Sequence, residues 1–316
     1  MSFETDEQME VDFYEKRMGM TNRMGRSLKL LVNGREKLKR ASHIYCYDGL
    51  HFNLVLFFQR VGLFKAQGKC IRRFAFRSRV ISRSQNLMKG ADPAFAIEFI
   101  TNEQVAEGQQ ILGADRARLR EWKIDTNWFR GVSLVNGRDQ EYVVPGTAFR
   151  NEDLVMELAK ANFNILRLGR PAALQQRYAE VVKTSQLKVC HNLPHSDYRS
   201  LLGKARAVLL PIVDCDEPAG FTAALEAIAM EVPLIASNSL GIDGLLKTCD
   251  YPIPSVSGNS LLNWKSAIGA FEDLESQSGF AEKIKHCASV VRKRHSIGAN
   301  FDDWIAFLRG KDCSCC

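Results

Sequence analysis

The sequence lacks any run of about eighteen apolar residues, so no membrane-spanning helix is expected. Its first residues are acidic and polar, which is not the pattern of a secretory signal. Nine cysteines are present, and most of them stand singly in apparent strands and helices. Without an export signal, this distribution favours reduced thiols in a cytoplasmic protein, with a peripheral position at a membrane left open.

Acidic residues are also missing from the whole stretch between Lys65 and Lys89. The basic residues in it are Lys65, Lys69, Arg72, Arg73, Arg77, Arg79, Arg83 and Lys89. One interpretation is a surface for an anionic membrane, a phosphorylated acceptor or a nucleic acid. The other is a solvated helix face joined to the end of a strand. The net charge of +7 does not choose among these partners.

The chain of 316 residues is longer than one ordinary core requires, which predicts two domains. Its 46% hydrophobic and 25% charged residues are typical of a soluble globular protein. Short apolar runs alternate with helical patterns throughout, which predicts an α/β fold with two doubly wound, Rossmann-like domains and a ligand cleft between them. The expected strands in the first half span 43–47, 69–75, 94–100 and 119–124.

The most informative stretch runs from Asp214 to Asn238 and reads as loop, helix, turn and strand. A loop that enters a helix beside a parallel sheet presents free amide N–H groups and the positive end of the helix dipole to an anion. Gly220 allows close backbone approach, and Thr222 adds a hydroxyl. Glu226, one turn further on, can accept hydrogen bonds from ribose hydroxyls. An ordinary turn with a surface glutamate is the alternative.

A second loop of the same kind follows the predicted strand Gln140–Gly146. It contains Gly146, Thr147 and Arg150 and leads into a helix that Asn151 or Asp153 can cap. The guanidinium of Arg150 offers a planar fork for phosphate oxygens. The alternative role for Arg150 is that of a surface salt-bridge partner.

Asp48 and His51 lie just past the end of the predicted strand 43–47. In an open α/β sheet, the carboxyl ends of the strands face the ligand cleft. Asp48 and His51 are therefore candidates for a base on the acceptor side and its neighbour. They also fit a capping aspartate and an ordinary histidine at a helix start.

The order of these motifs resembles that of GT-B glycosyltransferases, in particular the large retaining family often called family 4. The resemblance spans His43 to Leu308 and is best from Trp122 to Leu246. The motifs that carry it are Arg118–Phe129, Val144–Arg150, Val189–Leu202 and Gly220–Met230. The last of them, GFTAALEAIAM, is the most specific.

The resemblance implies a nucleoside diphosphate sugar as the donor substrate, with no cofactor. Glu226 is implied to hold the ribose, and the amides of Gly220, Phe221 and Thr222 are implied to face the diphosphate or the sugar. Arg150 is nearest to the family's basic residue for the diphosphate. The donor groups at two helix N-termini and an arginine need no metal. Retention of configuration is implied by the resemblance alone.

The sequence departs from the family in several places, among them Glu231 where the family usually has a glycine and the lack of a clear lysine partner for the loop arginine. The family has an acidic residue eight positions before the ribose-binding glutamate, where this chain has Pro218. Glu217 stands one place further back and Asp216 two, so a local insertion restores the catalytic role, which is otherwise lost. We also expect a shortened acceptor domain. The expected units are an acidic leader over 1–20, that domain over 21–131, a donor domain over 132–298, a final helix over 299–309 packing toward the N-terminal domain, and a cysteine-rich tail over 310–316.

The function predicted is sugar transfer to an unknown acceptor, with catalysis assigned to Glu217, Asp48 and His51. One alternative is a non-catalytic relative that binds a nucleotide-sugar or serves as a partner subunit. Another is a DNA-modifying or nucleic-acid-binding protein, which rests on the run from Lys65 to Lys89 alone. The tail from Cys313 to Cys316 fits lipidation, metal binding or an unordered end.

Overall fold

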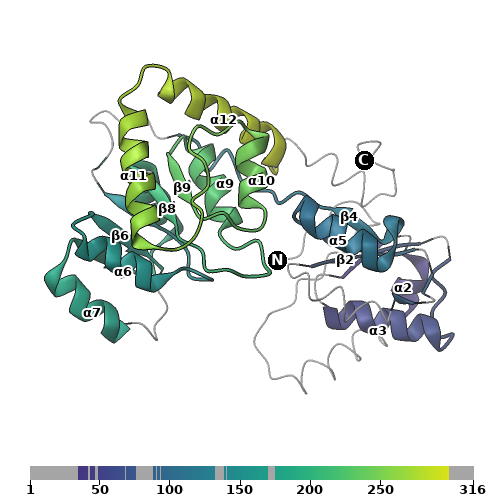
Figure 1. Ribbon diagram of the computed structural model, residues 1–316. Helices are drawn as coiled ribbons and strands as arrows, with labels where there is room; N and C mark the ends of the chain where they lie inside the picture. Colours follow the sequence, from purple (N-terminus) through teal and green to yellow (C-terminus); the bar gives the residue numbers. More distant parts are fainter. Residues whose placement is uncertain are drawn as a thin grey trace.

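The structure is a computed structural model of the chain, and it describes residues 35–41, 43–46, 49–67, 69–75, 88–89, 91–92, 94–131, 139, 141–169 and 175–298. These residues form two lobes, each with its own parallel sheet (Figure 1). The prediction of an α/β fold with two parallel-sheet domains is therefore confirmed. The leader over 1–20, the final helix over 299–309 and the tail over 310–316 lie outside the described residues.

The first lobe has a four-stranded sheet whose described strands follow chain order, β1-β2-β3-β4, and are all parallel. Its elements are α2 (Arg35–Arg40), β1 (His43–Cys46), α3 (Gly49–Arg60), β2 (Cys70–Phe74), β3 (Phe95–Phe99), α5 (Asn102–Leu112), the 3-10 turn η1 (Ala114–Arg116) and β4 (Ala117–Leu119). Phe52 of α3 packs edge-on against Phe95 of β3 at 5.7 Å between ring centroids. Every residue of β3 is buried, as expected for a parallel strand with both faces covered.

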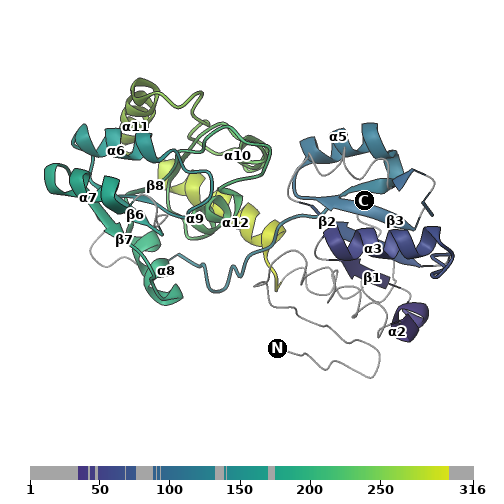
Figure 2. The ribbon, with the colours of Figure 1, turned by 90° about the horizontal axis from the view of Figure 1, so that it is seen from below.

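The second lobe has a five-stranded parallel sheet in the order β7-β6-β5-β8-β9. Its elements are β5 (Tyr142–Val144), α6 (Glu152–Lys160), β6 (Ile165–Leu168), α7 (Gln175–Thr184), β7 (Leu187–Cys190), α8 (His195–Lys204), β8 (Ala207–Leu210), α9 (Phe221–Ala229), β9 (Leu234–Ala236), α10 (Ile242–Thr248), α11 (Leu261–Glu275) and α12 (Phe280–His295). Figure 2 shows α6 and α11 on one side of the strands and α8 and α12 on the other. The chain therefore winds in both directions from β5.

Helix α9 is the central helix of this lobe. All of its residues except Thr222 are buried, because small alanines let it lie close to the sheet while α12 covers it from outside. A helix that is apolar all round belongs in a core. The helix ends at Ala229, before Glu231 takes a left-handed φ of 61°, and Pro233 stands immediately before β9, where a helix cannot resume.

The two lobes are joined by a segment that we predicted to be a strand over 119–124. The structure corrects this prediction, since β4 ends at Leu119 and Ile124 makes only an isolated bridge, to Ser296. Ile124 donates its amide to the carbonyl of His295 at 2.9 Å and accepts from Ile297 at 3.0 Å. The segment therefore pairs with the end of α12 in the second lobe and cannot extend the first sheet.

In the described ranges, no helix has both the length and the apolar character needed to cross a bilayer.

Candidate functional site

The site predicted from sequence lies at the carboxyl ends of β5 and β8, which are neighbours at the point where the strand order reverses. The loops that follow these strands are held together by backbone hydrogen bonds. Asn151 donates to the carbonyl of Pro211 at 2.7 Å, and Val213 donates to that of Phe149 at 2.9 Å. In open α/β sheets, ligands bind at such a switch point. The two loops singled out in the sequence are thus adjacent.

The turn before α9 depends on Gly220. Its φ of 77° lies in the left-handed region, and a Cβ atom there would stand 3.0 Å from Cδ1 of Ile212. Glycine is favoured on both counts. The helix begins directly after it, so its first amides have no partner within the helix, and that of Phe221 makes only a long contact of 3.4 Å to the carbonyl of Pro218. Thr222 is exposed at this end, whereas Phe221 is buried and packs edge-on against His295 at 6.2 Å.

Glu226 lies further along α9 and is almost enclosed, with 9% of its surface exposed. Its Oε2 atom accepts a hydrogen bond from the hydroxyl of Tyr198 on α8, at 2.7 Å. Burial raises the pKa of Glu226 to about 7, while the bond from Tyr198 acts in the opposite direction. The same burial and the neighbouring carboxyl raise the pKa of Tyr198. A carboxyl with such a pKa changes its charge near neutral pH.

Arg150 turns inward at the end of the β5 loop. Its Nε donates to the carbonyl of Pro145 at 2.8 Å, and its Nη1 donates to that of Ala148 at 2.9 Å. Only 7% of the residue is exposed, and this burial lowers its pKa to about 10, so it stays charged at neutral pH. A Cβ atom on Gly146, whose φ is 83°, would stand 2.6 Å from Nη2 of Arg150. Arg150 thus shapes the loop while keeping a positive charge beneath it, and Thr147 is exposed on the loop.

A buried ion pair under this loop was not foreseen from the sequence. Arg167 of β6 is completely enclosed and contacts the carboxylate of Glu152 through Nε at 3.0 Å and Nη2 at 2.7 Å. Its Nη1 also donates to the carbonyls of Val144, at 3.0 Å, and Gly146, at 2.6 Å. The pair therefore holds the end of β5 at Val144 and the loop that follows at Gly146. An arginine inside a four-residue apolar strand was the available signal.

Of the three proposed catalytic residues, the structure describes the side chain of Glu217 alone. Glu217 is half-buried in the turn before α9, and its carbonyl accepts from the amide of Ala219 at 2.7 Å. Asp48 lies outside the described residues. His51 belongs to the first turn of α3, but its side chain lies outside what the structure describes. The arrangement of these three side chains relative to one another therefore stays a prediction.

The basic run from Lys65 to Lys89 is described at its two ends, and residues 76–87 lie outside the described part. The ammonium of Lys69 donates to the carbonyls of Lys39, at 2.7 Å, and Ala41, at 2.6 Å. Arg72 is buried. Both cations thus belong to the lobe's own packing.

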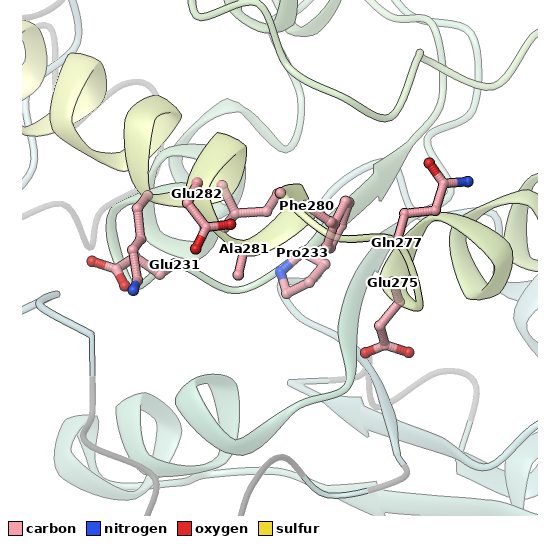
Figure 3. A pocket seen from close by; sticks show the side chains of 10 residues that line it. Glu231, Pro233, Glu275, Gln277, Phe280, Ala281 and Glu282 are labelled. Atoms are coloured by element: carbon pink, nitrogen blue, oxygen red, sulfur yellow. The ribbon is translucent and has the colours of Figure 1, made fainter.

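A separate pocket of about 270 Å³ lies where α11 meets α12. Figure 3 shows the three carboxylate side chains of its lining, Glu231, Glu275 and Glu282, around the apolar Pro233 and Phe280. None of the candidate residues lines it. With three glutamates against a single lysine, Lys285, its lining is negative overall, which is the opposite of what a diphosphate requires. Within the described ranges, no group of three histidine, cysteine, aspartate or glutamate side chains is arranged to hold a metal ion.

Several solved structures share the fold. A glycosyltransferase from Rickettsia africae superposes with a TM-score of 0.68 at 12% identity, covering 95% of this chain and 84% of that one. Sucrose-phosphate synthase from Thermosynechococcus elongatus gives 0.70 at 14% identity, with coverage of 93% and 80%. HepE from Anabaena, in complex with UDP, gives 0.68 at 10% identity, with coverage of 90% and 82%. The chain therefore has the GT-B fold. No sequence profile of a protein family matches it, and no curated protein does.

Proposed function

We propose that the protein is a glycosyltransferase that transfers a sugar from a nucleoside diphosphate sugar to an acceptor, without a metal ion and with retention of configuration. The observation that carries the proposal is the pairing of two anion-binding loops at the switch point of the second sheet, with Glu226 beside them. The GT-B neighbours support it, since one of them was solved with UDP and with UDP-glucose.

Two loops of the second lobe bind the diphosphate of the donor in this proposal. The amides of Gly220, Phe221 and Thr222 bind the diphosphate at the N-terminus of α9, where the helix dipole is positive. The loop of Gly146 and Thr147 faces the same place, and the buried charge of Arg150 lies beneath it. Negative charge that builds up on the leaving diphosphate is stabilised by these groups, which the fold has already oriented.

Glu226 accepts hydrogen bonds from the ribose hydroxyls in this scheme. Glu217, in the turn before α9, is the residue of the donor lobe that we assign to catalysis, with Asp48 and His51 on the acceptor side. The identity of the acceptor would be determined mainly by the first lobe.

A second function is favoured by one observation. Pro218, which stands eight positions before Glu226, is buried and carries no acid. If Glu217 does not replace the family's acidic residue, the protein binds a nucleotide-sugar without turning it over, as a non-catalytic relative or a partner subunit.

A screen of nucleotides by thermal unfolding tests the proposal. UDP, GDP, ADP and their sugars are added at millimolar concentration, and the melting temperature is measured. A ligand present at about 100 times its Kd stabilises the folded state by about 2.7 kcal/mol, which is about 5–11 °C for a domain of this size. Glu226→Ala should abolish most of the shift, and Glu180→Ala, an exposed glutamate on α7, should retain it. No shift with any nucleotide would contradict the donor site.

Turnover then separates the two functions. With the best nucleotide-sugar, the wild-type protein should release free nucleoside diphosphate. Glu217→Gln should still bind the donor, but it should release nucleoside diphosphate far more slowly. Donor binding without measurable release by the wild type would favour the non-catalytic function.

A further inference from the structure

Tyr198 is the residue that holds the Glu226 carboxylate in place. It projects from the first turn of α8 and crosses to α9, where its hydroxyl meets Oε2 of Glu226 at 2.7 Å. Among the described residues this is the one hydrogen bond made by the carboxylate, and Oε1 has no protein partner. Oε1 is not fully buried and keeps contact with solvent. The two oxygens of one carboxylate thus have different surroundings.

This asymmetry suits a hydroxyl-bearing ligand. A glutamate on a helix can adopt several side-chain rotamers, and holding one of them opposes the rotamer entropy. A hydrogen bond from a half-buried tyrosine holds the glutamate in one rotamer before the ligand binds. The ligand therefore does not have to order this side chain itself. Oε1 remains as the acceptor for a ligand hydroxyl.

The surroundings of Glu226 contain little other charge. Burial is the main influence on its pKa, and the hydroxyl of Tyr198 is the other group that acts on it. Arg150, from the β5 loop, acts electrostatically to lower the pKa of Tyr198, against the larger effect of burial. Asp216 and Glu217 lie in the turn before α9, and His295 of α12 packs against Phe221, but none of the three acts on the pKa of Glu226. Tyr198 is therefore the group that favours the ionised carboxylate directly.

We propose that Tyr198 is a positioning residue for nucleotide recognition: its hydroxyl fixes Oε2 of Glu226 so that Oε1 accepts a hydrogen bond from the ribose. This inference rests on the proposed function, because it requires a ribonucleotide in the donor site. It assigns to α8 a part in selecting ribose over sugars that lack its hydroxyls.

The test compares ribonucleotides with analogues that lack the ribose hydroxyls. UDP, GDP and ADP, each with its 2′,3′-dideoxy counterpart, are titrated by calorimetry into wild-type protein and Tyr198→Phe. For the nucleotide that binds, Tyr198→Phe should weaken the ribonucleotide by about tenfold, because a carboxylate without its tyrosine partner is less ionised and less well oriented. Affinity for the dideoxy counterpart should stay unchanged, so the preference for ribose falls by the same factor.

Tyr142→Phe is the matched control. The hydroxyl of Tyr142 also donates to a glutamate, Glu272, at 2.7 Å, but at the far side of the sheet between β5 and α11. This variant should leave both affinities and their ratio as in the wild type.

Two results would overturn the inference. If the wild type prefers the ribonucleotide and Tyr198→Phe keeps that preference, Tyr198 does not position the carboxylate. The same conclusion follows if Tyr198→Phe weakens both analogues equally, which is the result expected of a merely structural residue. If no ribonucleotide binds the wild type, the proposed function itself fails and the inference fails with it.

Discussion

Replacing Glu152 with alanine should lower the free energy of unfolding by about 3–5 kcal/mol, the largest single effect we expect in this protein. The reason is Arg167, which is completely enclosed and contacts Glu152 at 2.7 and 3.0 Å. Without the carboxylate, the guanidinium is a buried charge with only carbonyl partners. Tyr178 also donates its hydroxyl to Glu152 and would lose that partner.

The loss should reach the donor loop as well. Arg167 holds the carbonyls of Val144 and Gly146 through Nη1, at 3.0 and 2.6 Å. A guanidinium that shifts toward solvent cannot keep both contacts, so the turn at Gly146 becomes less well defined. Nucleotide affinity in Glu152→Ala should therefore fall together with stability.

Urea unfolding of the wild type and Glu152→Ala measures the first effect. Glu180→Ala is the control, because Glu180 forms its ion pair with Lys183 on the exposed side of α7 and should contribute less than about 1 kcal/mol. The double variant Glu152→Leu, Arg167→Met should recover part of the loss, since it removes the uncompensated charge. A single variant as stable as Glu180→Ala would show that the buried pair contributes nothing.

The sequence predicted well what depends on neighbouring residues. Gly220 before an alanine-rich helix identified the turn and α9, and Gly146 before Asn151 identified the second loop and α6. The adjacency of the two loops followed from the rule that parallel strands place their carboxyl ends at one edge of the sheet. These features were predictable because each is encoded within a few positions of the chain.

Contacts between distant positions were not predictable in this way. Tyr198 and Glu226 are 28 positions apart. They meet because the chain passes from α8 through β8 to α9, and the fold brings the two helices into contact. Arg150 was predicted to point toward a phosphate, and its inward turn depends on the carbonyls of its own loop. The segment over 119–124 has strand-like residues, but its hydrogen-bond partner is the end of α12, far along the chain. A pattern of apolar residues does not specify such a partner.

Glu226→Gln should change the pH dependence of stability. Burial raises the pKa of Glu226 in the folded state to about 7, above the ordinary value of 4.5 for a glutamate. A carboxyl raised in this way is most favourable to folding when protonated, below about pH 4.5, and this stability is lost as the pH rises through about 7. Glutamine stays neutral at every pH and keeps a similar shape. Relative to the wild type, the variant should therefore gain about 2–3 kcal/mol between pH 5 and pH 8.

Urea unfolding at pH 5 and pH 8 without nucleotide measures this difference. Glu180→Gln, at an exposed position, should show the same small difference from the wild type at both pH values. A constant difference for Glu226→Gln would mean that the buried carboxyl does not titrate in this range. If the gain appears, ionisation of Glu226 lowers the free energy of unfolding near neutral pH. A ligand that donates hydrogen bonds to Oε1 would offset that opposition, so nucleotide binding should itself become tighter as the pH rises from 6 to 8.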